Sequence, residues 1–330
     1  MSKFYEEVFE QPQVIRNTIH FNKESSFTNA GKPYLFTGMG SSLAASELLT
    51  AYFNQHGISS IAIDNSELLH YYTAMLEQHY VVVVSQSGES FEAKEIVKRY
   101  PHAVSVTNTK GSTVADHVYH VFYTYAQKEE AIASSKSFTT TVALLLLLGS
   151  KAAGLTMEDD LYKAADVLEK ELEKADEYKK QIGEALDPNR PLLLLGRGPS
   201  VFTARQGALT LKETARMYTE AMSASQFRHG PFELIKENLQ VLFFNPKGKT
   251  YEINQRYVLE MAELGAKMLY VSDEKLNHKN ICSLAIPSVN EYVSTIPYSL
   301  VTQLAAVELS AQKGLVAGQA ELISKVTGRE

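Results

Sequence analysis

The sequence predicts an α/β protein that consists of two tandem, doubly wound parallel sheets. Short apolar runs alternate with helical patterns over roughly the first 150 residues, as βαβ units do. The four consecutive valines at 81–84 are typical of a strand that is buried on both faces of a parallel sheet. The second half of the chain repeats the first, because the apolar run 192–195 and its Gly-rich turn 196–200 mirror residues 35–42, 158 positions earlier.

The elements of the first half follow in order. Residues 4–19 predict two short helices that meet at Gln11 and Pro12, because proline breaks a helical turn. The predicted strands are 33–37, 58–63, 81–84, 103–107 and 118–123. The first predicted helix follows the turn 38–42 and ends at 52. Two more are expected at 67–76 and 91–98, with a short helical turn at 112–117. A long apolar helix ends at about 148. Ligands of such a sheet bind at the carboxyl ends of its strands.

The second half begins after a charged segment. Within residues 151–190 an apolar stripe recurs at spacings of three and four, which predicts one connecting helix. The predicted organisation is therefore a first domain at 1–155, a connecting helix at 156–189, and a second domain with a C-terminal tail at 190–330. Later strands are expected at 240–244, 268–271 and 282–286, and a long helix at 294–313.

Composition excludes several classes of protein. The net charge is −6 and the sequence has no large basic block, so a nucleic-acid partner is not expected. A single cysteine, Cys282, excludes an internal disulfide and a cysteine-based metal cluster. The nine histidines show no ligand spacing with carboxylates, so no metal and no cofactor are expected. The polar start and the lack of an apolar run of about 20 residues predict a soluble, cytoplasmic protein without a membrane partner.

The turn after the valine run is the first candidate site. Ser85, Gln86, Ser87 and Ser90 stand, with Gly88, between a strand and a helix start. Backbone N–H groups at a helix N-terminus and serine hydroxyls bind anions, so this turn is a candidate phosphate cradle. An ordinary turn in which Ser90 caps the helix is the alternative. The corresponding turn of the second half, 245–250, lacks the hydroxyl run, which predicts one phosphate site per chain.

Four ordered motifs resemble a known family. Residues 85–90, 133–140, 209–213 and 227–231 together resemble the double sugar-isomerase (SIS) family, in particular the isomerase portion of the glutamine–fructose-6-phosphate aminotransferases (glucosamine-6-phosphate synthases). The resemblance covers nearly the whole chain and implies two flavodoxin-like SIS domains.

The resemblance also implies roles for single residues. Ser85, Gln86, Ser87 and Ser90 correspond to residues that bind the substrate phosphate, and Ser42 and Ile132 to residues that contact the sugar. Glu213 corresponds to the glutamate that moves a proton between C1 and C2. His229 corresponds to the histidine that helps to open the sugar ring from the partner subunit, which implies a homodimer with shared active sites. Lys325 corresponds to the tail lysine that forms a Schiff base with the ketose.

These roles suit the chemistry. The proton at C1 or C2 becomes acidic only beside an imine or a polarised carbonyl, and a lysine imine provides that electron sink. A histidine titrates near neutral pH and can donate a proton to the ring oxygen. Each of the three side chains also fits a plain structural role, as a helix-surface, turn or solvated tail residue.

The chain departs from the synthases in three respects. One is that the tail needs a one-residue shift relative to Leu322 to align Lys325. The chain also starts at Met1 and Ser2 without a glutaminase nucleophile, so glutamine-independent chemistry is expected. Gln206 and Thr210 stand where the synthases have a glutamate and a lysine, on the helix face of Glu213. We therefore expect an enzyme, a deaminase, isomerase or deglycase, that acts on a 6-phosphorylated amino sugar or fructosamine. A non-catalytic phosphosugar sensor and a simple phosphosugar isomerase without nitrogen chemistry remain the alternatives.

Overall fold

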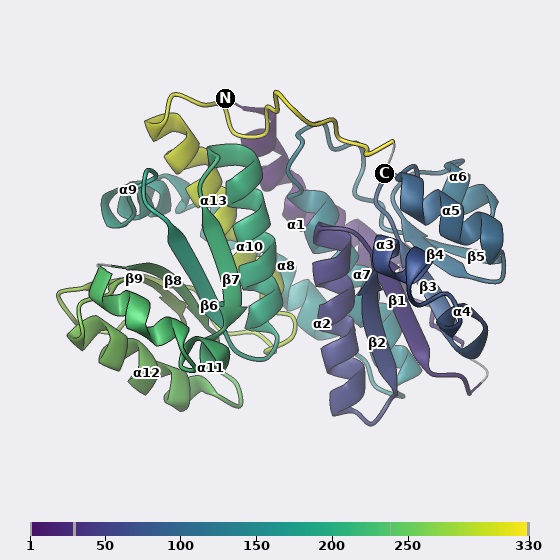
Figure 1. Cartoon of the computed structure of the whole chain (residues 1–330), viewed down its shortest axis with the longest axis horizontal. Coiled ribbons are helices and arrows are strands. Elements are labelled where there is room, and N and C mark those ends of the chain that lie inside the picture. The colour runs from purple at the N-terminus through teal and green to yellow at the C-terminus, as the bar shows by residue number, and fades with distance from the viewer. Residues whose placement is uncertain (1, 29–30, 238, 329–330) are drawn as a thin grey trace. The chain divides into compact units, whose positions relative to one another are not determined.

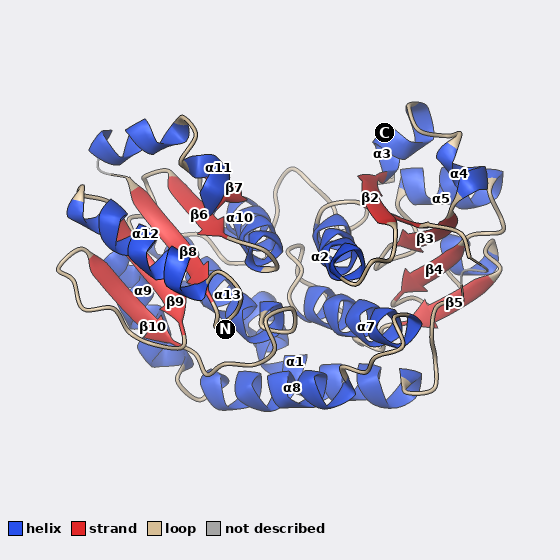
Figure 2. Ribbon diagram, turned by 90° about the horizontal axis from the view of Figure 1, so that it is seen from below, coloured by secondary structure: helices blue, strands red, loops and turns tan. Residues whose placement is uncertain are grey.

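The chain folds into two compact units, each built around one parallel sheet. The computed structural model describes residues 2–28, 31–237 and 239–328. The first-sheet unit comprises Gln13–Glu130, Ser134–Tyr162 and Glu321–Glu330, and the second-sheet unit comprises Met1–Pro12, Ala131–Ala133 and Lys163–Ala320. Helices cover both faces of each sheet (Figure 2). The predicted α/β class with two tandem doubly wound sheets is confirmed.

The first-sheet unit has the strand order β2-β1-β3-β4-β5, with every neighbouring pair parallel (Figure 1). β3 lies between β1 and β4, and its valines are almost fully buried, as the apolar run predicted. The strands are β1 (Tyr34–Gly38), β2 (Ser60–Asp64), β3 (Tyr80–Val84), β4 (Val104–Thr107) and β5 (His120–Tyr123). The helices are α2 (Ser41–Gln55), α3 (Asn65–His70), α4 (Met75–Gln78), α5 (Phe91–Arg99), α6 (Thr113–Asp116) and α7 (Lys136–Ala152).

The second-sheet unit repeats this topology. Its order is β10-β9-β8-β6-β7, so β6 and β8 take the places that β1 and β3 have in the first sheet. The strands are β6 (Leu192–Gly196), β7 (Thr219–Ser223), β8 (Gln240–Asn245), β9 (Lys267–Ser272) and β10 (Ile281–Ala285). The later helices are α10 (Ser200–Ala215), α11 (Ala224–Phe227), the 3₁₀ helix η1 (Pro231–Glu237), α12 (Tyr251–Glu263) and α13 (Thr295–Gln312). The internal repeat read from the sequence is therefore present in the fold.

The predicted break at Pro12 is wrong, because α1 (Lys3–Asn22) runs through the proline as one helix. Proline has no N–H to donate to the carbonyl four residues earlier, that of Val8. The side-chain amide of Gln11 donates to this Val8 oxygen at 2.9 Å instead. The neighbouring glutamine thus satisfies the acceptor that proline leaves open.

The prediction of a single connecting helix is also wrong, because two helices occupy the charged segment, α8 (Glu158–Leu172) and α9 (Ala175–Ala185). The buried carboxylate of Glu171 spans the break between them. It accepts hydrogen bonds from the Lys174 ammonium at 2.8 Å and from the Tyr178 hydroxyl. A sequence without proline or glycine at the break gives no sign of this side-chain bridge.

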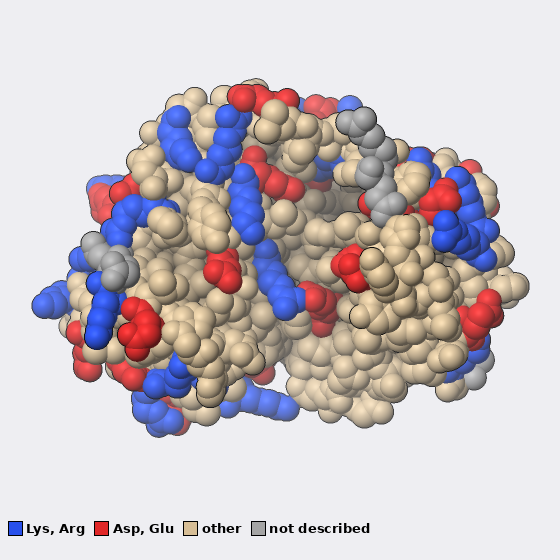
Figure 3. Space-filling view, in the orientation of Figure 1, with Lys and Arg blue, Asp and Glu red and all other residues tan. Residues whose placement is uncertain are grey.

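The surface carries mixed charge. On the face drawn in Figure 3, basic and acidic side chains are interspersed. Within the described ranges, no helix combines the length and the apolar character that crossing a membrane requires.

Close packing of α10 on α13 provides a test of the fold. A Cβ atom at Gly207 would lie 2.5 Å from Thr302 Cγ2 and 3.0 Å from Leu194 Cδ2. Threonine is stiff at χ1, so the contact cannot relax freely. We expect overpacking in Gly207→Ala to lower the free energy of unfolding by about 1–3 kcal/mol. The higher helix propensity of alanine offsets up to about 1 kcal/mol of this loss.

Urea unfolding would measure this loss. Gly328→Ala is the matched control, because no heavy atom lies within 4 Å of a Cβ atom there. If the two variants were equally stable, Gly207 would not be required by the helix contact.

Candidate active site

The turn after β3 is compact and held together by its own hydrogen bonds. Gly88 N–H donates to Ser85 Oγ at 3.2 Å, and Glu89 N–H donates to Ser87 Oγ at 3.1 Å. The Ser85 and Ser90 hydroxyls lie 3.4 Å apart. Ser90 precedes α5 as its N-cap residue but makes no side-chain cap hydrogen bond. The alternative in which Ser90 serves as an ordinary side-chain cap is therefore not what the structure shows.

Two anchors hold this turn against the neighbouring strand and helix. The carbonyl oxygen of Gln86 accepts a hydrogen bond from Asn108 N–H at 3.0 Å, just after β4. The carboxylate of Glu89 accepts from the N–H and the hydroxyl of Thr113, at 2.6 and 2.9 Å. The backbone hydrogen bond from Thr113 is the chief cause that holds the pKa of Glu89 below its ordinary value. The turn is thus fixed before any ligand binds.

Ser42 lies beside this turn. A Cβ atom at Gly38 would be 2.9 Å from both Ser42 Cβ and the Val84 carbonyl oxygen. Because only glycine fits here, the start of α2 can approach the end of β3 closely. The structure therefore brings Ser42 to the sheet edge from which residues 85–90 leave, the candidate phosphate turn, which is called the phosphate turn below.

The C-terminal tail reaches the same edge. The Thr327 carbonyl oxygen accepts a hydrogen bond from Phe91 N–H, the first residue of α5, at 3.1 Å. Two residues earlier, the Lys325 ammonium lies 2.7 Å from Glu129 Oε2. Lys325 and the phosphate turn thus belong to one unit and to one neighbourhood.

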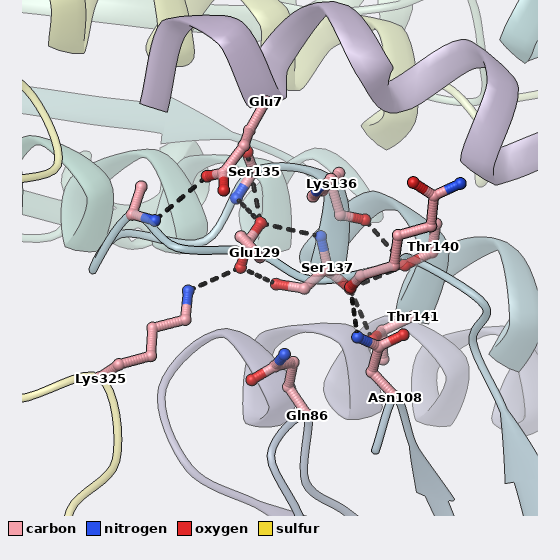
Figure 4. Close-up of polar contacts among 12 residues, drawn as sticks. Glu7, Gln86, Asn108, Glu129, Ser135, Lys136, Ser137, Thr140, Thr141 and Lys325 are labelled. Carbon is pink, nitrogen blue, oxygen red and sulfur yellow. Dashed lines mark hydrogen bonds and ion pairs between the residues drawn. The ribbon is translucent and has the colours of Figure 1, made fainter. Parts of the chain in front are cut away.

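Glu129 is the centre of this neighbourhood, and the sequence analysis missed it (Figure 4). Its side chain has no exposure and lies before the N-terminus of α7. Oε1 accepts from the N–H groups of Ser135 and Ser137, at 2.9 and 3.1 Å, and Oε2 accepts from the Ser137 hydroxyl at 2.6 Å. A carboxylate at a helix N-terminus is favoured by the free N–H groups and the helix dipole.

The charge state of Glu129 follows from these contacts. Burial by itself raises the pKa of Glu129, but the Lys325 ammonium and the hydrogen bonds from Ser137 outweigh it and hold the pKa below its ordinary value. Glu129 is therefore ionised at neutral pH, and its charge holds the lysine in place. The only sequence signal is a glutamate a few residues before a serine-rich helix start.

The remaining predicted residues lie in the second-sheet unit. Glu213 is half-buried near the end of α10, and His229 is exposed in the turn after α11. Ile132 donates its N–H to the Gly318 carbonyl oxygen at 3.1 Å. Gln206 and Thr210 are buried on α10 and joined by a side-chain hydrogen bond of 3.2 Å, which confirms that they share a helix face.

The predicted site residues thus form two groups. Ser42, the phosphate turn and Lys325 come together in the first-sheet unit, whereas Ile132, Glu213 and His229 lie in the other unit. Glu129, Ser135 and Ser137 join the first group as unpredicted members. This arrangement can hold a phosphate group and present a primary amine in the same unit.

Comparison with known proteins identifies the family. A model described as "SIS domain" matches residues 27–151 and 186–313. The glutamine–fructose-6-phosphate aminotransferase [isomerizing] of Thermococcus kodakarensis is 30% identical, over 93% of this chain and 55% of its own length. That of Brucella abortus is 28% identical, over 97% of this chain and 57% of its own length. The chain spans about half the length of these curated relatives.

Solved structures share the fold. The C-terminal domain of glucosamine-fructose-6-phosphate aminotransferase from Francisella tularensis superposes with a TM-score of 0.88 at 22% identity, over 96% of this chain and 98% of that one. Glucosamine-6-phosphate deaminase from Thermotoga maritima gives a TM-score of 0.80 at 22% identity, over 98% of this chain and 99% of that one.

Gly88 provides a test of the phosphate turn. Its φ is +65°, and a Cβ atom there would lie 2.1 Å from Ser112 Oγ. We expect Gly88→Ala to destabilise the protein by at least the roughly 1–2 kcal/mol that a left-handed non-glycine residue costs. Gly111→Ala is the control, because Gly111 has a φ of +68° but no neighbour within 4 Å. Equal melting temperatures for the two variants would contradict a close contact between this turn and Ser112.

Removal of the Lys325 charge tests the ion pair. In Lys325→Met the buried Glu129 carboxylate loses its counter-ion, so we expect a loss of about 3–5 kcal/mol at pH 7. Because the folded-state pKa of Glu129 is lowered, the pair stabilises the protein above the ordinary carboxyl pKa of about 4.3. That stabilisation is lost as the pH falls through the folded-state pKa, so the gap between wild type and variant closes in acid.

Urea unfolding from pH 7 to well below the ordinary carboxyl pKa would measure the gap and its closure. Lys128→Met is the control, because Lys128 is 83% exposed and its ion pair with Glu130 lies at the surface. A loss in Lys325→Met no larger than in Lys128→Met would show that the tail contact contributes nothing. In Glu129→Gln/Lys325→Met, part of the lost stability should return.

Proposed function

The chain belongs to the SIS domain family, and we propose that it is an enzyme that processes a 6-phosphorylated amino sugar or fructosamine by ketose–aldose chemistry without glutamine. The observation that carries this proposal is the shared position of Lys325 and the phosphate turn at one edge of the first sheet. A phosphate anchor and a primary amine in one neighbourhood suit a phosphorylated sugar whose carbonyl forms an imine.

The phosphate is proposed to bind at the turn 85–90. The hydroxyls of Ser85, Ser87 and Ser90 gather around the N-terminus of α5, a helix of nine residues. The Phe91 N–H already donates to the Thr327 carbonyl oxygen, so the proposed attraction for a dianionic group comes from the serine hydroxyls and the dipole of α5. Gln86 adds a side-chain amide, which points from the turn in the direction of Ser137 in Figure 4. Ser42 and the backbone of Ile132 are proposed to contact the sugar.

Lys325 is proposed to be the imine-forming amine. In its ion pair with Glu129 it is positioned but protonated, and an ammonium is not a nucleophile. Imine formation therefore requires that one proton leaves Lys325, either to Glu129 or to the oxygen of the sugar carbonyl. The neutral amine then forms a C–N bond to the carbonyl carbon. The former carbonyl oxygen takes up this proton and a second one from the nitrogen, so the C–O bond breaks and the oxygen leaves as water. The protonated imine that remains is the electron sink for proton removal at the neighbouring carbon.

Glu213 is proposed to move the proton between C1 and C2, and His229 to open the sugar ring. The exposed position of His229 would allow it to enter the site of a second chain, so we also propose a homodimer with shared active sites. Sedimentation of the protein would test this, since a fully active monomer would contradict it.

The first test is an activity screen. The full chain is incubated with glucosamine 6-phosphate and with a panel of fructosamine 6-phosphates, and the release of ammonia or amine is assayed. Turnover of at least one compound is expected. If every compound bound without turnover, the protein would instead act as a phosphosugar sensor.

Glu213→Gln tests the proton-transfer role. We expect kcat to fall by about 10²–10⁴-fold, the usual contribution of a general base, with little change in phosphate binding. Glu220→Gln is the matched control, because Glu220 is an exposed glutamate on β7 of the same unit. Equal kcat values for the two variants would remove Glu213 from the mechanism.

Because an ammonium in an ion pair is not a nucleophile, the contact of Lys325 with Glu129 favours one alternative. This alternative is a simple isomerase that works through an enediol without an imine. Borohydride reduction in the presence of substrate separates the two routes. The imine route predicts a covalent sugar adduct on Lys325 that is absent from Lys325→Met. If the enzyme turns over but no adduct forms, the enediol route is correct.

A further inference from the structure

In a doubly wound sheet the strand order reverses at a switch point, where a crevice opens between two strand ends. The second-sheet unit has its own switch point, equivalent to the one that carries the phosphate turn. The strand order places this crevice between the ends of β6 and β8, as between β1 and β3 in the first sheet. The turn after β1 has a glycine with a φ of +51°, Gly40, and the turn after β6 has one with a φ of +54°, Gly198. The turns after these two equivalent strands thus share a glycine in the left-handed φ region.

A carboxylate of the chain itself lies in the second crevice. Glu291, from the segment between β10 and α13, has Oε1 2.4 Å from the position of a Cβ atom at Gly248. The same oxygen is 3.8 Å from the Cβ position at Gly198, in the turn after β6. A side chain at Gly248 would occupy the place of this carboxylate. Glu291 thus lies between the turns that follow β6 and β8.

The contacts of Glu291 are those of a bound anion. The backbone N–H of Lys249, just before α12, donates a hydrogen bond to its carboxylate, and the Lys249 ammonium lies near enough to favour the charged form. Burial nevertheless raises the pKa of Glu291. Arg197, which precedes Gly198 in the turn after β6, has its Nε buried without a hydrogen-bond partner among the described residues. One backbone N–H and one ammonium, both of Lys249, therefore act on the carboxylate.

We propose that Glu291 is a built-in anion that fills a phosphate-type cradle at the switch point of the second-sheet unit. With the carboxylate in place, this cradle is closed to inorganic phosphate and to phosphate monoesters. With the carboxylate removed, it binds them. The first-sheet unit differs, because the glutamate of its corresponding segment, Glu129, binds the N-terminus of α7 instead. This inference is independent of whether the first turn binds a substrate.

Backbone NMR of the full chain tests the proposal, with inorganic phosphate as the probe. In Glu291→Ala we expect saturable shifts of the Lys249 and Gly198 amide signals, with an affinity at least about tenfold higher than in wild type. Loss of a tethered competitor, whose effective concentration is in the millimolar range, produces a gain of this order. The Ser87 and Gly88 amides report separately on the first turn, so a failure of the proposed function appears there and not at Lys249.

Glu252→Ala is the control, because it removes one exposed negative charge from the first turn of α12 without emptying the cradle. An equal gain in Glu252→Ala would overturn the proposal, as would the absence of a shift in a folded Glu291→Ala. If Glu291→Ala does not fold, Glu291→Gln keeps the size of the side chain and removes its charge. This variant should show a smaller gain, and no gain in it would count against the proposal. Wild-type protein that binds phosphate at Lys249 as tightly as Glu291→Ala does would also overturn it.

Discussion

The buried charge of Glu129 is the constraint on which the candidate site depends. An ionised carboxylate without exposure is stable in a protein only when donors and a cation surround it. Here the donors come from the first residues of α7, and the cation comes from Lys325 in the tail. One carboxylate therefore fixes where α7 begins and where the tail lysine lies. The serine-rich motif at 133–140 has a structural reason in these hydrogen bonds, apart from any contact with a ligand.

The sequence predicted the parts of the fold that depend on regular periodicity. The valine run of β3, the Gly-rich turns and the repeat between the two halves all follow from backbone geometry and burial. It failed where one side chain replaces a backbone contact. Gln11 keeps α1 continuous through Pro12, and Glu171 bridges the break between α8 and α9. Strand β7 (Thr219–Ser223) was missed because its sequence, Thr-Glu-Ala-Met-Ser, has no apolar run.

The candidate site shows the same division. The phosphate turn could be predicted because strand, hydroxyl-rich turn and helix are contiguous in the sequence. Glu129 could not, because its partner Lys325 is 196 positions away and the pairing depends on the fold. The roles of Glu213, in α10, and of His229, in the turn after α11, rest on the family resemblance and stay predictions.

The tail that carries Lys325 has no helix or strand in its described residues after α13. It meets the rest of the first-sheet unit through the Lys325 ion pair and the Thr327 carbonyl, while Leu322 between them and α13 is 98% exposed. Handling of the purified protein should take this into account. A purification tag is best attached at the N-terminus, because carboxypeptidase digestion that reaches Lys325 would leave the buried Glu129 carboxylate without its counter-ion.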